Sequence, residues 1–254
     1  MQQKRPFKIV RLEFISPLHI GLGANDQYDS MDNMLHSDTI SGALTSAYVS
    51  LYGDENVPEF IKSFRVSSAF PFCNNHYFMP KPMVQIKLDW GNDEKNCETK
   101  TLKKLEYIEL PVYEQLIAGE TVKVKDEMLP GNKKFLWSGD GRKDAQFMTS
   151  TIQQRVMVPR SGQEDARPYY IERLFFRRGS GLFFFVEVND EALEKVAACI
   201  RFLETTGLGT DKSVGNGQFE SSFENLSIAL PGNSNMHLLL SLYCPIMDEI
   251  TEDS

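Results

Sequence analysis

The most constraining feature of this chain is a glycine-rich loop between a predicted helix and a predicted strand. Four glycines occur in the eleven residues 207–217, and two of them close the loop as Gly-Asn-Gly. Before the loop, apolar residues of 191–205 recur at helical spacing, and after it 218–230 is typical of a strand. The order is therefore helix, loop, strand.

This order argues against a nucleotide-binding loop. Dinucleotide and P-loop sites run from strand through loop into helix, so that the helix N-terminus faces the phosphates. Lys212 and Ser213 match the end of a P-loop, but Asp211 stands where that motif requires glycine. The missing side chains instead let a polyanion approach the backbone; a tight connection without a ligand is the alternative. The loop residues predicted to contact such a polyanion are Gly207, Gly209, Thr210, Lys212, Ser213, Gly215, Asn216 and Gly217.

Composition narrows the class of protein. With 254 residues and 41% hydrophobic content, the chain can bury a core as one or two domains. No apolar run approaches the length of a transmembrane helix, and no secretory signal is evident. Four cysteines at long spacings are typical of a reducing compartment. The sequence therefore predicts a cytoplasmic protein without membrane contact.

Charge is distributed unevenly along the chain. The net charge of -8 argues against a free-standing nucleic-acid binder, which is usually basic. Residues 142–178, however, hold eight Lys or Arg against four Asp or Glu, while the tail from Asp248 holds four acids and no base. A basic stretch on an acidic chain suits a subunit that contacts RNA on one surface and protein on others; an ordinary solvated surface is the alternative.

The remaining pattern predicts an α+β fold. Ser37 or Asp38 is predicted to cap a helix that ends near Gly53, and Pro111 fits the first turn of a shorter helix. Residues 179–181 are predicted as a hairpin turn. Further segments are predicted as extended: 7–15, 65–72, 77–79, 105–110, 149–160, 169–176, 182–188 and 237–243. Without insertions the order is β-α-β-β-α-β, which is a ferredoxin-like (RRM-like) antiparallel sheet with helices on one face.

Three separated motifs resemble one family. Ser-Pro-Leu-His-Ile-Gly at 16–21, Leu-His-Ser-Asp-Thr-Ile-Ser-Gly-Ala-Leu at 35–44 and the glycine loop are similar to motifs of the RAMP superfamily of CRISPR proteins. The resemblance covers about residues 7–243, and the first two motifs most resemble the fourth subunit of the type III-A (Csm) effector complex. It implies a non-catalytic, cofactor-free subunit that binds the 5′ handle of the guide RNA. Its implied protein partners are the large polymerase/cyclase-like subunit and a backbone RAMP subunit.

The resemblance also implies a domain organisation. A ferredoxin-like unit would occupy 1–230, with large insertions and a thumb-like hairpin at about 142–168. Residues 231–254 would begin a second ferredoxin-like unit that is truncated or degenerate. The predicted RNA contacts outside the glycine loop are His19, Gly21, His36, Ser37, Gln154, Arg155, Arg160 and Arg177.

Several of these residues admit a second interpretation. His36 and Asp38 at a helix start are compatible with a general base or a metal ligand, but caps explain Ser37 and Asp38 more simply. His19 is either a loop histidine packed on the helix or an RNA contact. The aromatic residues from Tyr169 onward either stack on bases or belong to the sheet core.

A metal site is not predicted. Cys73-Asn-Asn-His76 resembles half of a zinc site, but a structural zinc needs four ligands and no second half follows at suitable spacing. The leading hypothesis is therefore a non-catalytic RNA-binding subunit. The alternative is a guide-processing or target-cleaving endoribonuclease of the same superfamily, with His36 or His19 as base or Asp38 as metal ligand. A ferredoxin-like protein-interaction domain that does not bind RNA is the third hypothesis.

Overall fold

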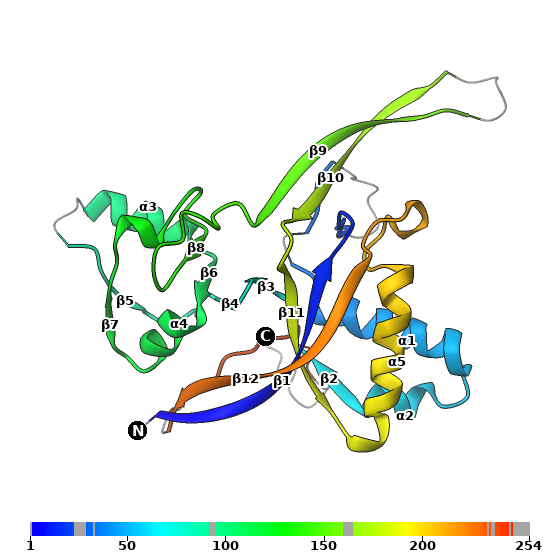
Figure 1. Cartoon of the computed structure of the whole chain (residues 1–254), viewed down its shortest axis with the longest axis horizontal. Helices are drawn as coiled ribbons and strands as arrows, with labels where there is room; N and C mark the ends of the chain where they lie inside the picture. The colour runs from blue at the N-terminus through cyan, green and yellow to red at the C-terminus, as the bar shows by residue number, and fades with distance from the viewer. Residues whose placement is uncertain are drawn as a thin grey trace, which may run out of the picture.

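A large, mainly antiparallel sheet organises the chain (Figure 1). The computed structural model describes residues 2–22, 29–32, 34–91, 95–159, 165–232, 234, 237–243 and 245. The sheet strands, in spatial order, are β12 (Phe219–Pro231), β1 (Gln2–Phe14), β11 (Ser180–Val188), β3 (Phe70–Cys73), β4 (His76–Pro80), β6 (Tyr107–Glu109) and β8 (Phe135–Leu136). β2 (Phe64–Val66) also pairs with β11, and β6 and β8 form a parallel pair. The predicted α+β class is confirmed.

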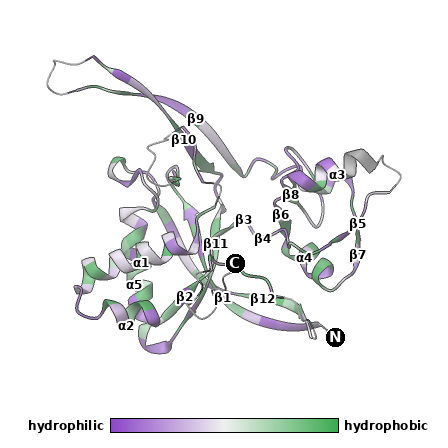
Figure 2. Ribbon diagram, turned by 180° about the vertical axis from the view of Figure 1, so that it is seen from behind, coloured by the Kyte–Doolittle hydropathy of each residue, from purple (hydrophilic) through white to green (hydrophobic). Residues whose placement is uncertain are grey.

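Helices cover one face of this sheet. Successive side chains of a strand point to opposite faces, and apolar residues gather on the face that the helices cover. In β1, Val10, Leu12 and Phe14 are buried on the same side. Against them pack α1 (Ser37–Tyr52) and α5 (Asp190–Thr206), and a short α2 (Val57–Lys62) follows α1. Hydrophobic and hydrophilic residues alternate along α1 and α5 (Figure 2). The predicted helix, loop and strand at 191–230 are confirmed as α5, the glycine loop and β12.

The chain between β4 and the arm that follows forms a lobe at one end of the sheet, and β6 and β8 belong to both (Figure 1). Its elements are β5 (Lys87–Asp89), α3 (Lys95–Lys104), α4 (Leu110–Ile117), β7 (Thr121–Lys123) and the 3-10 turn η1 (Asp126–Met128), together with β6 and β8. Aromatic rings fill its core, with Phe78 stacked on Phe147 and in edge contact with Trp137. The same apolar cluster includes Ile9 and Phe183, which joins the lobe to the second face of the sheet.

A two-stranded arm extends away from the body (Figure 1). It consists of β9 (Met148–Met157) and β10 (Arg167–Phe176), which are paired along their whole lengths. The predicted hairpin at about 142–168 overlaps this arm. The prediction of a hairpin turn at 179–181 is wrong, because β10 pairs with β9 whereas β11 joins the main sheet. Gly181 serves close strand packing instead, since a Cβ there would lie 2.0 Å from the Leu12 carbonyl oxygen.

Two further sequence predictions are wrong. His36 occupies the N-cap position of α1 without a side-chain cap, so neither Ser37 nor Asp38 caps the helix. The Ser37 hydroxyl instead accepts the Leu242 N–H at 3.0 Å. Segment 237–243 is not a strand; it is held by isolated hydrogen bonds, such as that from Ser68 N to the Leu240 carbonyl at 2.8 Å.

The division of the chain at residue 230 stays a prediction. Within the described ranges, no helix combines the length and hydropathy that a bilayer crossing requires.

Candidate nucleic-acid interface

The segment after β1 joins the arm to the body. Leu18 and Leu174 of β10 exchange two backbone hydrogen bonds, with N–O distances of 2.9 and 2.8 Å. Next to this bridge, His19 Nδ1 lies 2.6 Å from the Glu172 carbonyl oxygen. His19 is only 2% exposed, so its ring fixes the foot of the arm. Its predicted role as an RNA contact stays a prediction, and the second interpretation, a packed loop histidine, describes its position here.

The same segment is hydrogen-bonded to the glycine loop on its other side. Thr210 N donates to the His19 carbonyl at 3.1 Å, and Gly217 N donates to the Pro17 carbonyl at 2.7 Å. Gly21 lies against the loop as well, because a Cβ at Gly21 would be 2.9 Å from Thr210 Cγ2. Residues 16–21 are thus a bridge between the arm and the glycine loop.

The start of α1 is linked to this bridge through Asp32. Asp32 N donates to the Ile20 carbonyl at 2.9 Å, and the Asp32 carboxylate lies 3.3 Å from His36 Nε2. His36 Nδ1 is buried without a hydrogen-bond partner in the described part of the chain. The three motifs that carried the family resemblance therefore meet at one place in the fold.

Three of the loop glycines are required by the backbone conformation and packing of the protein itself. Gly207, Gly209 and Gly217 have φ values of 82, 90 and 75°. A Cβ on these residues would lie 2.6, 2.3 and 1.8 Å from carbonyl oxygens of the protein itself. Packing of the loop on itself and on the bridge therefore already requires glycine at these positions, and their predicted contact with a polyanion stays a prediction. Gly215, with φ 82°, faces open space, and the same prediction stands there.

The loop donors divide into exposed and internal ones. Thr210, Lys212 and Ser213 are exposed, the last two in the 3-10 turn η2 (Lys212–Val214). Asn216 is buried, and its Nδ2 donates to the Asp211 carboxylate at 2.7 Å. A ligand on this surface would thus meet Thr210, Lys212 and Ser213 first.

A buried ion pair that the sequence analysis missed fixes the loop to the arm. The Arg173 guanidinium of β10 pairs with the Asp211 carboxylate, and the two side chains are 7% and 20% exposed. Arg173 Nη1 also donates to Gln153 Oε1 of β9 at 3.3 Å. Asp211, which replaces the P-loop glycine, was the available signal, but its partner is distant in sequence.

The arm carries two predicted RNA contacts on opposite faces. Arg155 lies opposite Tyr169, and Gln154 lies opposite Tyr170, and all four residues are exposed. Directly paired residues share a face of the hairpin, so Arg155 and Tyr169 form one surface. Arg160 lies outside the described residues.

The other two predicted contacts serve the protein itself. The Arg177 guanidinium pairs with Asp144 of the inserted lobe and donates to the Lys143 carbonyl at 3.2 Å. Ser37 is buried under residues 237–243. The structure thus brings His19, Gly21, His36 and the glycine loop together, whereas Ser37 is buried and Arg177, although exposed, is paired with Asp144.

The half zinc motif is used differently. His76 Nδ1 lies 2.7 Å from the Glu109 carboxylate, and burial raises the pKa of the Cys73 thiol to about 11. The His76 ring is thus occupied by Glu109, and the Cys73 thiol lies buried in the apolar core. The described residues contain no group of three or more His, Cys, Asp or Glu placed to hold a metal ion.

Comparison with known proteins defines the class. The family model of the RAMP superfamily matches residues 11–220, and the chain therefore belongs to the RAMP superfamily. It is 30% identical over 208 residues to the CRISPR system Cms protein Csm4 of Thermococcus onnurineus, covering 78% of this chain and 65% of that protein. The corresponding protein of Methanocaldococcus jannaschii is 23% identical over 249 residues, covering 84% and 64%. The chain spans just under two thirds of the length of both relatives.

Solved structures share the fold. A Csm1–Csm4 cassette in complex with cA4 matches with a TM-score of 0.59 and 22% identity, covering 90% of this chain and 73% of that chain. A Csm3–Csm4 subcomplex of the type III-A CRISPR-Cas interference complex matches with a TM-score of 0.57 and 21% identity, covering 88% and 70%. The resemblance to the RAMP superfamily and to Csm4 proteins that the sequence motifs indicated is confirmed.

Proposed function

We propose that this protein is a non-catalytic RNA-binding subunit of a type III-A CRISPR effector complex. In this proposal it holds the 5′ handle of the guide RNA in the cytoplasm and joins a large polymerase/cyclase-like subunit to a backbone RAMP subunit. The observation that carries the proposal is the union of arm, bridge and glycine loop in one hydrogen-bonded surface. The Csm1–Csm4 and Csm3–Csm4 assemblies of the structural relatives support the choice of partners.

The fold supports this proposal at a finer level. The core strands lie in the order β12-β1-β11-β2, with α1 and α5 as the connections that cover one face. We propose that this core is a ferredoxin-like unit, a layout that many RNA-binding modules use. The inserted lobe and the arm are then additions to that unit.

The exposed residues suggest how the glycine loop and the arm share contacts with the RNA handle. Lys212 and Ser213 suit contacts to phosphates, which position an RNA without reading its sequence. Arg155 and Tyr169 on the arm suit stacking on unpaired bases, which is how single-stranded RNA is recognised. No cofactor or metal ion is needed for either contact.

The first prediction tests the shared surface. Because the chain carries a net charge of -8, we expect the isolated protein to bind handle RNA weakly and to distinguish it poorly from a scrambled RNA. Tight and selective binding should appear once the large and backbone subunits are added. Equilibrium binding with both RNAs, with and without the partner subunits, measures this. Tight, selective binding by the lone chain would contradict the shared surface, and no binding in the full complex would overturn the proposed function.

Lys212 offers a sharper test within the complex. Lys212→Ala should weaken handle binding for every RNA sequence and reduce the slope of log K against log salt by roughly one. Lys62→Ala on the remote helix α2 is the matched control, since Lys62 is also exposed. An unchanged slope in Lys212→Ala would remove this residue from the interface.

The nuclease alternative gains no support from the geometry. His36 pairs with Asp32, and the Asp38 carboxylate accepts the Thr39 N–H of its own helix at 2.6 Å. We therefore expect His36→Ala and Asp38→Ala to leave RNA cleavage by the assembled complex intact when assembly is normal. Gel assays of cleavage, with assembly checked by size-exclusion chromatography, measure this. Cleavage of handle RNA by the isolated chain that either substitution abolishes would favour the nuclease.

A further inference from the structure

β12 is the edge strand of the main sheet. One side pairs with β1 along thirteen residues, and the other side has no strand beside it in the described residues. Ser221 N and Ala229 N nevertheless have partners on that outer side, the carboxylates of Glu204 and Glu114 at 2.9 and 2.6 Å. Since backbone groups alternate between the two sides of a strand, the N–H and C=O groups of the odd-numbered residues from 221 to 229 face outward.

These two carboxylates leave a short open window. Glu204 projects from α5 and Glu114 from α4, so each helix occupies one end of the edge. Between the ends, Phe223, Asn225 and Ser227 have outward backbone groups without a partner in the described part of the chain. Proteins usually protect exposed strand edges, because unpaired backbone groups accept another strand. Here the protection stops on both sides of a window about five residues long.

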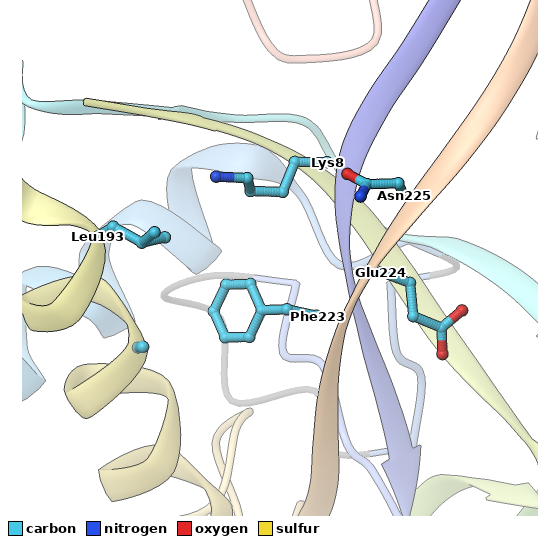
Figure 3. A pocket seen from close by; sticks show the side chains of 6 residues that line it. Lys8, Leu193, Phe223, Glu224 and Asn225 are labelled. Carbon is cyan, nitrogen blue, oxygen red and sulfur yellow. The ribbon is translucent and has the colours of Figure 1, made fainter. Parts of the chain in front are cut away.

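A groove adjoins this window. Its volume is about 290 Å³, and it lies between α5 and β12. Figure 3 shows the Phe223 ring and the Leu193 side chain beside it, with Lys8 reaching across. Ala197 completes the helix side. Because an apolar cavity of about 150 Å³ can hold benzene, the groove has room for one leucine-sized side chain.

The groove has one charge without a counter-charge. Lys8 is partly buried opposite Asn225, and it forms no ion pair with any described residue. Glu224 is close in sequence but points away from Lys8 (Figure 3), and its carboxylate binds Arg11 at 3.1 Å and Tyr77 at 2.7 Å. Burial raises the pKa of Glu224. The hydrogen bond from Tyr77 and the charge of Arg11 have a larger, opposite effect, so that its pKa lies below the ordinary value. Within the described part of the chain, Lys8 therefore has no carboxylate beside it.

We propose that the window at 223–227 binds an extended segment of a partner protein by strand addition. The segment would place a leucine-sized side chain in the groove and an Asp or Glu at Lys8. Alternate residues of a strand share a face, so these two side chains lie two positions apart in the partner sequence. Backbone hydrogen bonds to residues 223–227 provide affinity, and the groove provides the choice of side chain. This site is separate from the RNA surface and does not rest on the proposed function.

The test uses the full chain labelled with 15N and the capped peptide Ac-Thr-Leu-Thr-Glu-Thr-NH2. The expected result is a saturable shift of the amide signals of Phe223, Asn225 and Ser227. The control peptide Ac-Thr-Leu-Glu-Thr-Thr-NH2 has the same composition and charge, but its Leu and Glu fall on opposite faces. It should bind about tenfold more weakly or not at all. Equal responses to both peptides, or no shift at these amides, would overturn the proposal.

Two variants identify the contacts. Asn225→Pro removes an outward N–H and spares the bonds to β1, because an edge strand tolerates proline there. Lys8→Glu reverses the charge. Each variant should weaken binding of the first peptide about tenfold, which is about 1.4 kcal/mol. Lys4→Glu, on β1 like Lys8, should leave the binding unchanged. Unchanged peptide binding in both variants would show that the peptide does not bind at residues 223–227.

Other occupants would show different results. Concentration-dependent dimerisation of the chain that Asn225→Pro abolishes would assign the edge to a second copy and overturn docking of a different protein. Displacement of the peptide by single-stranded oligouridylate would assign Lys8 to RNA and would also overturn docking of a different protein. Handle binding by the assembled complex should be unchanged in both variants, which separates this site from the RNA surface.

Discussion

Replacing Gly217 by alanine should cost about 3–5 kcal/mol of the free energy of unfolding. The new Cβ would lie 1.8 Å from the Leu208 carbonyl oxygen, and the residue would have to keep a φ of 75°. Displacing the packed backbone and holding a left-handed conformation both contribute to this loss. The Leu208 N–H bond to the Gly217 carbonyl, 2.9 Å long, should break with it.

Gly215→Ala is the matched control for this change. Its φ of 82° is similar, but no heavy atom lies within 4 Å of the added Cβ. Only the conformational cost of about 1–2 kcal/mol should remain. Urea unfolding of both variants measures the difference, provided that the m-values agree. Equal losses in the two variants would show that the loop does not pack as described.

The second large effect is expected at the ion pair between arm and loop. Arg173→Met leaves the half-buried Asp211 carboxylate with Asn216 as its remaining partner, and loss of a hydrogen bond to a charged group costs about 1.5–3 kcal/mol. The double variant Arg173→Met/Asp211→Leu should recover part of this loss, because both charges are then gone. Urea unfolding of Arg173→Met, of Asp211→Leu and of the double variant completes the cycle that gives the coupling energy.

Hydrogen exchange should show where this loss acts. We expect faster exchange of the β10 amides near Leu174 and of the glycine loop in Arg173→Met, while the β1–β12 pairing stays protected. Arg142→Met is the control, because Arg142 pairs with Asp140 on the exposed surface and should contribute nothing measurable. Unchanged exchange at the foot of the arm would mean that Arg173 does not hold it.

Sequence reasoning succeeded where a local pattern determines the structure. α5 has an apolar stripe at helical spacing and a capping Asn189, whose side chain accepts the Ala192 N–H. From Val10 to Phe14, β1 alternates buried and half-buried residues, and the glycine loop separates two unlike periodicities. These signals need no knowledge of distant residues.

It failed where the cause is a partner far away in the chain. α3 is rich in lysine and has no apolar stripe that predicts a helix, so it went unrecognised. Segment 237–243 has the composition of a strand but makes isolated hydrogen bonds, such as that from Ser68 N to the Leu240 carbonyl, in place of a ladder. At the candidate site, the exposed donors Lys212 and Ser213 were predictable from residue type. The internal use of Gly217 and the burial of Ser37 were not, because each depends on a contact brought by the fold.

The pairing of β1 has a consequence for synthesis on the ribosome. Leu12 pairs with Leu182, and Phe14 pairs with Phe219, so both neighbours of the first long strand are made late. At about 5–20 residues per second, the first strand waits roughly 10–30 s for β11. Its apolar residues are without their sheet partners for that time, which is when aggregation competes with folding. Such long-range pairing gives a high contact order and slow folding, so this chain should depend on chaperones during translation.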